Sequence, residues 1–196
     1  MIRNAIISVH NKTYIDKFAK FLINKNVTIY ASTGTYNYLK SKKIRSGRLR
    51  EITSLTGFPE ILNGRVKTLH PKIYGGLLAK RNNINHMQDL ETYNIPQFDL
   101  AVVNLYPFEE VSKTTNDEDL LLENVDIGGH TIIRASVKNH KDVLVVTNPY
   151  DYDHIISNFN NINNKQFAQK ALEYVIDYDM VIYNHFYKNA IYKKYT

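Results

Sequence analysis

The pattern that most constrains the fold is an alternation of short apolar runs with segments of helical periodicity. Residues 4–9 form an apolar run, and apolar side chains recur at helical spacing over residues 15–23. A second apolar run at 27–31 leads into the small-residue turn 32–35 and another helical segment from Tyr36. Strands that alternate with helices pair in parallel through right-handed crossovers. The pattern therefore predicts an α/β fold with a doubly wound, mainly parallel, Rossmann-like sheet.

Three further runs extend the predicted sheet. Residues 50–53 form a weak strand candidate, whereas 100–105 and 143–147 are the continuous apolar kind found inside parallel sheets. From Tyr150 onward the periodicity is helical. A chain of 196 residues suits one buried core. We expect a single domain, 1–196, with an α/β core over 1–149 and C-terminal helices over 150–196.

Composition narrows the classes of function. The formal net charge of +6 suits an anionic partner, but the basic residues are scattered among acidic ones, which disfavours nucleic acid. The sequence has no cysteine, so disulfides, thiolate nucleophiles and cysteine-bound zinc are excluded. No apolar run has the length of a membrane span, and the N-terminus does not resemble a signal peptide. We expect a cytoplasmic protein without a membrane partner.

Chemistry-bearing loops follow the predicted strands. Ligands of parallel sheets bind outside the carboxyl ends of the strands, so loops 10–13, 32–35, 104–108 and 126–129 are expected to converge. Small and hydroxyl residues at 32–35, before a helix, are typical of a phosphate cradle, which Lys12 would join. An ordinary turn with a threonine N-cap is the alternative.

The loop that spans residues 57–71 is long and rich in polar side chains. Arg65 and Lys67 alternate around Val66, so in an extended loop both face one side, and Thr68 adds a hydroxyl. This arrangement is suited to a polar substrate, although a solvated basic loop is the alternative. His70 precedes a proline, and we expect it to be structural.

The segment Asp126-Ile127-Gly128-Gly129 precedes an expected helix over 131–140. A glycine pair permits close approach of the backbone, and its amides can form an oxyanion hole. A flexible start of the helix is the alternative interpretation.

Several of these motifs together resemble a known family. The resemblance rests on residues 7–9 with Lys12-Thr13, and on residues 56–60, 64–71, 104–108, 126–129 and 138–140. In these motifs the sequence resembles the IMP cyclohydrolase domain of the bifunctional purine-biosynthesis protein, which has a methylglyoxal-synthase-like fold. The resemblance spans nearly the whole chain and does not extend into the transformylase domain that usually follows.

The resemblance implies a reaction and a division of roles. The reaction is ring closure of 5-formamidoimidazole-4-carboxamide ribonucleotide (FAICAR) to inosine monophosphate (IMP) with loss of water, without metal or cofactor. Lys138 would be the main proton-transfer residue, supported by Asp126, with Lys67 and Tyr106 beside them. The implied substrate-binding residues are His10, Asn11, Lys12, Thr13, Ser32, Thr33, Gly34, Thr35, Arg65, Val66, Thr68, Val103, Asn104, Ile127, Gly128 and Gly129.

The sequence departs from the family pattern at a few positions. His10-Asn11 stands where Ser-Asp is usual, Tyr14 and Thr33 each replace a frequent glycine, and His130 replaces an apolar or small residue. None of these departures removes a residue assigned to the chemistry.

Two other functions are compatible with the same fold. A nucleotide-binding regulatory module, like that of carbamoyl-phosphate synthetase, would bind without reacting, and a methylglyoxal-synthase-type lyase would not need the long loop. The joint presence of Lys67, Tyr106, Asp126 and Lys138 favours catalysis. The partners implied by the resemblance are FAICAR, IMP, a separate AICAR transformylase and a second copy of the chain.

Overall fold

The fold is built on one parallel sheet. The computed structural model describes residues 2–187. Its five strands lie in the order β3-β2-β1-β4-β5, and every neighbouring pair is parallel. The strands are β1 (Asn4–Val9), β2 (Thr28–Ala31), β3 (Leu49–Glu51), β4 (Leu100–Asn104) and β5 (Leu144–Val146). The predicted doubly wound α/β fold is confirmed.

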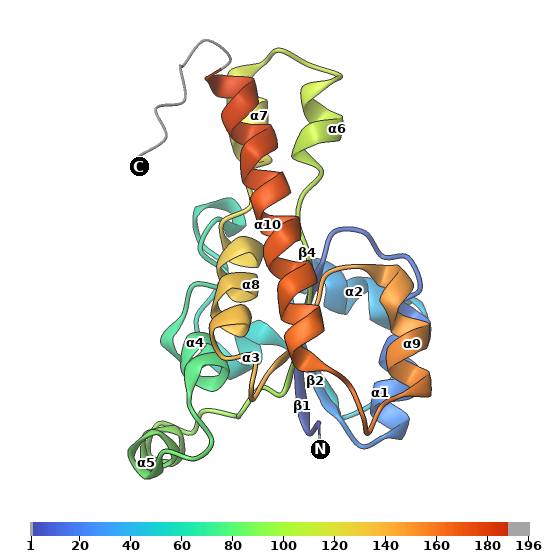
Figure 1. Ribbon diagram of the computed structural model, residues 1–196, viewed down its shortest axis with the longest axis vertical. Helices are drawn as coiled ribbons and strands as arrows, with labels where there is room; N and C mark the ends of the chain where they lie inside the picture. Colours follow the sequence, from blue (N-terminus) through green and yellow to red (C-terminus); the bar gives the residue numbers. More distant parts are fainter. Residues whose placement is uncertain (1, 188–196) are drawn as a thin grey trace.

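Helices cover both faces of this sheet (Figure 1). Helices α1 and α9 lie on one face, while α4, α8 and α10 lie on the other. The α-helices are α1 (Ile15–Asn24), α2 (Thr33–Ser41), α3 (Ile52–Thr56), α4 (Pro71–Leu78), α5 (Ile84–Thr92), α6 (Phe108–Ser112), α7 (Glu118–Glu123), α8 (Gly128–Lys138), α9 (Tyr152–Ser157) and α10 (Asn164–Phe186). Short 3-10 helices occur at Leu62–Gly64 and Pro149–Asp151.

The strands divide their side chains between two cores. In β1, Ala5, Ile7 and Val9 pack with α1 and α9, whereas Ile6 packs with α4 and α8. Successive side chains of a strand point to opposite faces, so a strand covered on both faces must be apolar throughout. The continuous apolar runs in the sequence are explained by this double burial.

Helix α10 extends beyond the sheet. Its first half packs against β5 and α8, and its second half rises beside α6 and α7 (Figure 1). The expected helical character after residue 150 is thus observed up to Phe186, while residues 188–196 of that segment lie outside the described residues. The division of the chain at residue 149 stays a prediction. Among residues 2–187, no helix has the length and apolar character needed to cross a membrane.

Several element boundaries differ from the sequence prediction. Helix α2 begins at Thr33, so the small-residue turn is its first turn, and α8 begins at Gly128 rather than at residue 131. The strand expected at 50–53 ends at Glu51, where α3 takes over. Helices α2 and α8 start on small residues that favour turns, because the free amides of a first turn need no side chain of high helix propensity, whereas α3 starts at Ile52 directly after β3.

Gly76 of α4 is required by close packing. A Cβ at this position would lie 2.3 Å from the Pro96 carbonyl oxygen and 2.7 Å from the Phe98 ring. Alanine would gain about 0.5–1 kcal/mol of helix propensity, but overpacking costs about 1–3 kcal/mol. We expect Gly76→Ala to lower the free energy of unfolding, with a fall in Tm of about 2–4 °C per kcal/mol in thermal denaturation.

Gly47→Ala is the matched control, because a Cβ at Gly47 meets no heavy atom within 4 Å. Its free energy of unfolding is expected to stay within about 0.5 kcal/mol of the unsubstituted protein. Equal melting temperatures for the two variants would contradict the packing argument.

Candidate active site at the carboxyl ends of the strands

A large pocket lies where the chain changes direction across the sheet. From β1 the chain proceeds to β2 and β3 on one side, and it later returns to β4 on the other side of β1. Ligands of open α/β sheets bind at this switch point. The pocket has a volume of about 720 Å³, within the range of about 300–1,000 Å³ typical of small-molecule sites. The predicted site residues that line it are His10, Lys12, Ser32, Gly34, Thr35, Arg65, Lys67, Thr68, Asn104, Tyr106, Asp126, Ile127, Gly128 and Gly129.

Asn104, at the end of β4, holds the loop that follows β1. Its Oδ1 accepts hydrogen bonds from the backbone N–H groups of His10 (2.6 Å) and Asn11 (2.8 Å). Its Nδ2 donates to the Asn11 carbonyl at 3.1 Å. Lys12 Nζ in turn donates to the carbonyl oxygens of Val9 and His10. The loop is therefore fixed against the neighbouring strand, with Lys12 at the pocket.

The first turn of α2 forms the second wall. Ser32 Oγ donates to Thr35 Oγ1 at 3.2 Å, and Thr35 Oγ1 accepts from the Val9 N–H and donates to the Val9 carbonyl. These bonds fix the start of α2 beside the end of β1. Free amides and the helix dipole make such a start attractive to an anion.

The loop that carries Arg65 and Lys67 is not extended as predicted. After the 3-10 turn it folds into further turns, in which the Leu69 N–H donates to the Val66 carbonyl at 2.8 Å. Both basic side chains nevertheless line the pocket. Arg65 forms an ion pair with Glu123 of α7 across the rim.

Three ionisable side chains, those of Lys67, Tyr106 and Asp126, line the same pocket. Lys67 Nζ donates to the Tyr106 hydroxyl at 3.2 Å. Asp126 Oδ1 accepts from the Gly129 N–H at 2.7 Å. Burial raises the pKa of Asp126, and hydrogen bonds from the Gly129 and Tyr106 N–H groups and the charge of Lys67 oppose the rise. A carboxyl group in this environment is suited to exchanging a proton.

Gly128 permits the start of α8 to approach Thr68. A Cβ on Gly128 would lie 2.2 Å from Thr68 Oγ1, so a side chain there would collide with the hydroxyl. Thr68 is 2 % exposed, and its Oγ1 has no hydrogen-bond partner within the described part of the chain. A buried hydroxyl without a partner is costly, and a ligand group in the pocket would satisfy it.

Positive charge is concentrated in the pocket. The pKa of Lys12 is lowered by burial and then by the charge of Lys67, and the pKa of His10 is lowered by burial and then by the charge of Lys12. Each of these effects opposes the charged form of the base. A bound anion would relieve this repulsion, as the net positive charge of the chain also suggests.

Six predicted site residues do not line the pocket. Asn11, Thr13, Thr33, Val66, Val103 and Lys138 are the six. Asn11 supports its loop through Asn104, Thr33 Oγ1 donates to Glu60 Oε1 at 2.6 Å, and Val103 is buried in β4.

Lys138 lies apart from the other three predicted catalytic residues. Lys138 is exposed at the last position of the 11-residue helix α8, whose first turn lines the pocket. Ten residues of helix separate the two ends by about 15 Å. Of the four predicted catalytic residues, Lys67, Tyr106 and Asp126 line the pocket, and the proton-transfer role of Lys138 stays a prediction.

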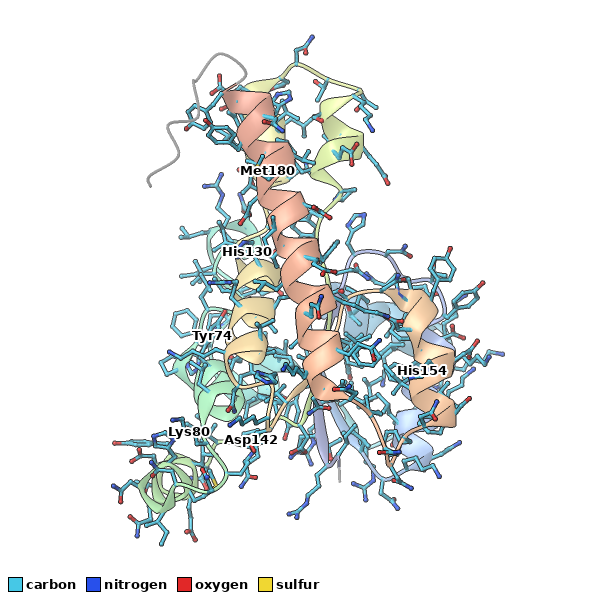
Figure 2. All side chains as sticks on the ribbon, viewed as in Figure 1. Tyr74, Lys80, His130, Asp142, His154 and Met180 are labelled. Carbon is cyan, nitrogen blue, oxygen red and sulfur yellow. The ribbon has the colours of Figure 1, made fainter. Side chains whose placement is uncertain are left out.

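Two histidines have roles outside the pocket. His70 is the N-cap of α4, where its Nδ1 accepts from the Lys72 N–H at 3.2 Å, which confirms the structural role predicted for it. His130 lies in the first turns of α8 beside α10 (Figure 2), and its Nε2 is 3.1 Å from the carboxylate of Asp179.

The sequence did not single out some pocket residues. Glu123 is the most consequential, because it pairs with Arg65 at the rim. It lies three residues before Asp126, but a glutamate in an acidic helix does not by itself indicate a residue of a binding site. The other pocket residues without a predicted role are Ser8, Val9, Asn63, Gly64, Leu69, Leu122 and Val125.

The arrangement combines anion binding with proton transfer. Within residues 2–187 there is no group of three or more histidine, aspartate and glutamate side chains placed to hold a metal ion. The pocket offers two lysines, an arginine, two carboxyl groups, hydroxyls and helix amides, which suit a phosphorylated polar ligand.

Comparisons with known proteins agree with this geometry. The family model of the MGS-like domain matches residues 14–131, and that of the AICARFT/IMPCHase bienzyme matches residues 136–196. The bifunctional purine biosynthesis protein PurH of Persephonella marina is 44% identical over 188 residues, which is 93% of this chain and 36% of that protein. PurH of Buchnera aphidicola subsp. Baizongia pistaciae is 42% identical over 196 residues, or 96% of this chain and 36% of that protein. The chain thus spans little more than a third of the length of these relatives.

A solved structure has the same fold over almost its full length. The crystal structure of ForH superposes with a TM-score of 0.79 at 27% sequence identity, covering 94% of this chain and 98% of that one. The MGS-like match alone accounts for more than half of the present chain. The chain therefore belongs to the MGS-like domain family, and the relatives it matches along nearly its whole length are bifunctional purine biosynthesis proteins.

Proposed function

We propose that the chain is an IMP cyclohydrolase, which closes the purine ring of FAICAR to give IMP. The observation that carries the proposal is the convergence of Lys67, Tyr106 and Asp126 on one pocket with the start of α8. The AICARFT/IMPCHase match and the purine-biosynthesis relatives support the same reaction. A regulatory nucleotide module would need the anion-binding residues but no such proton-transfer group.

In the proposed complex, the phosphate of the nucleotide lies at the start of α2. The amides of that turn can donate to phosphate oxygens, the hydroxyls of Ser32 and Thr35 hold the turn against β1, and Lys12 supplies charge. The base then extends toward Thr68 and the start of α8, on the other side of the pocket. A ligand with an anion at one end and a polar ring at the other matches this distribution.

The reaction is an intramolecular condensation. The carboxamide nitrogen attacks the formyl carbon and loses a proton, while the formyl oxygen receives the displaced electron pair and is protonated. The resulting hydroxyl leaves as water with the proton of the formamido nitrogen, and a C=N bond forms. Both reacting groups belong to one molecule, so the protein must select their orientation and move protons.

Roles follow from the positions of the side chains. Asp126, which is partly buried and accepts a hydrogen bond from the Gly129 N–H, is assigned to take the carboxamide proton. Lys67 and the Tyr106 hydroxyl are assigned to the developing charge on the formyl oxygen, to which the first amides of α8 also donate. Arg65, held by Glu123, would close the rim over the bound nucleotide.

The activity is tested directly with the purified chain and FAICAR. Chromatographic detection of IMP, formed in step with loss of FAICAR, is the expected result. Saturable binding of FAICAR without IMP would favour the regulatory module, and neither binding nor product would reject both functions.

Lys67→Met is expected to lower kcat by roughly 10²- to 10³-fold, the usual effect of removing one donor to a developing oxyanion. The measurement is the initial rate of IMP formation at saturating FAICAR. Lys141→Met is the matched control, since Lys141 is exposed and outside the pocket. Equal turnover of the two variants would contradict the role of Lys67.

Lys138→Ala tests whether Lys138 takes part in the reaction, as the family resemblance implies, or lies too far from the pocket to do so. Because Lys138 lies at the far end of α8, we expect this variant to lose less turnover than Lys67→Met in the same assay. A loss as large as that of Lys67→Met would restore Lys138 to the reaction.

The pH dependence of kcat follows from the raised pKa of Asp126. A proton acceptor works only when ionised, so turnover is expected to fall as pH decreases through that pKa, which lies above the ordinary value of 3.8. Rates of IMP formation across the acidic range, with the fold checked by circular dichroism, measure this limb. Turnover that rises on acidification would mean that Asp126 acts as a proton donor instead.

The proposed reaction implies a functional partner. The formyl group of FAICAR must be supplied by a transformylase, and the family name AICARFT/IMPCHase joins the two activities. A second copy of the chain stays a prediction from the family resemblance.

A further inference from the structure

Helix α10 provides two tyrosine hydroxyls that hydrogen-bond to backbone segments next to the pocket. Tyr174 and Tyr178 lie four residues apart and so share a face of the helix. Both rings pack against the core between the sheet and α8, and Figure 1 shows α10 running alongside α8. Neither side chain lines the pocket itself, so any influence on a bound ligand must pass through other residues.

The hydroxyl of Tyr178 is bonded to the chain on both sides of Val125. It accepts from the Asp126 N–H at 2.8 Å and donates to the Asn124 carbonyl at 3.0 Å. Burial raises the pKa of Tyr178 to about 12, so the hydroxyl keeps the proton that the second bond requires. The backbone of Asp126 is thereby fixed relative to α10.

The hydroxyl of Tyr174 holds the segment that follows β4. It accepts from the Leu105 N–H at 3.0 Å, and Leu105 lies between Asn104 and Tyr106. The next N–H along the chain, that of Tyr106, is hydrogen-bonded to Asp126. Successive amides after β4 are therefore held by α10 and by the carboxyl group assigned to proton transfer.

We infer that Tyr178 and Tyr174 are positioning residues for the reaction, which set the placement of Asp126 and Tyr106 through the backbone. The inference rests on the proposed function. Placement errors of about 1 Å can lower a rate on the order of 10²-fold even when they arise away from the chemistry. The two tyrosines lie outside the MGS-like match over residues 14–131, so α10 adds this support to the common core.

A purely structural role and a positioning role differ in what they change. If Tyr178 only stabilised the fold, its loss would lower Tm and leave kcat unchanged at temperatures where the protein is folded. A positioning role lowers kcat while KM, set mainly by the phosphate and ribose contacts, changes little.

The test is Tyr178→Phe, which removes the hydroxyl and keeps the ring. We expect kcat for IMP formation to fall about tenfold or more, with KM within about threefold. We also expect a change in the pH of half-maximal turnover on the acid limb, because the Asp126 carboxyl moves. Circular dichroism and thermal melting establish the temperature range in which the variant is folded.

Tyr152→Phe is the matched control. It removes the hydroxyl of another buried tyrosine, which stacks on Phe18 at 4.6 Å between centroids on the opposite face of the sheet. Its kcat, KM and acid limb are expected to match those of the unsubstituted protein. Tyr174→Phe is the second variant, and it removes the hydrogen bond to the Leu105 N–H. It is also expected to lower kcat while KM changes little.

The outcomes separate the inference from the proposed function. An unsubstituted chain that forms no IMP overturns the proposed function itself. An active chain whose Tyr178→Phe variant keeps the same kcat and acid limb overturns only the inference. If Tyr178→Phe does not fold, an unchanged kcat and acid limb in Tyr174→Phe would overturn it equally.

Discussion

The pairing of β1 with β4 is the constraint on which the rest of the site depends. In this parallel register Val9 is the partner of Asn104, so the last residues of both strands lie side by side. Asn104 can then bond the backbone of the loop after β1, and this loop places Lys12 beside the start of α2. A shift of one residue would turn Asn104 toward the other face and remove these bonds. The phosphate end of the proposed site is thus a consequence of strand register. The reacting end is assembled from the loop that carries Lys67, the segment after β4 that carries Tyr106, and the segment before α8 that carries Asp126.

Two ionisable side chains of the pocket lie in surroundings that disfavour their charged forms. Burial lowers the pKa of Lys12 and raises that of Asp126, so the protein alone disfavours the charged form of both groups. Such groups persist where they serve a ligand, because an anion beside Lys12 and a transferable proton beside Asp126 offset the cost. The buried hydroxyl of Thr68 has the same character, since its hydrogen-bonding capacity is unused within residues 2–187. At Lys12, Asp126 and Thr68, a group that is unfavourable in the free protein is therefore one that a ligand would satisfy.

The sequence predicted the sheet and most of the pocket because both rest on local signals. Doubly buried strands must be apolar, and loops at the carboxyl ends of parallel strands must meet, so Ser32, Asn104 and Asp126 could be assigned to one crevice before any coordinates. What the sequence could not supply is the tertiary geometry, which local sequence does not encode. Lys138 falls one helix length from Asp126 because α8 starts at Gly128 and runs away from the pocket. Glu123 reaches Arg65 only through the tertiary packing of α7, which no periodicity reveals.

The contribution of α10 was likewise not predictable from local sequence, because its contacts join residues far apart along the chain. Tyr178 is 52 residues from Asp126, and Tyr174 is 69 residues from Leu105. A tyrosine four residues from another on a helix is typical of an amphipathic face, and from the sequence both would be taken for core residues. Their rings are indeed packed in the core, but their hydroxyls end at backbone amides that carry the ionisable group. A helix that closes the hydrophobic core therefore also determines where the polar site is held, since one side chain supplies the apolar ring and the hydrogen-bonding oxygen at once.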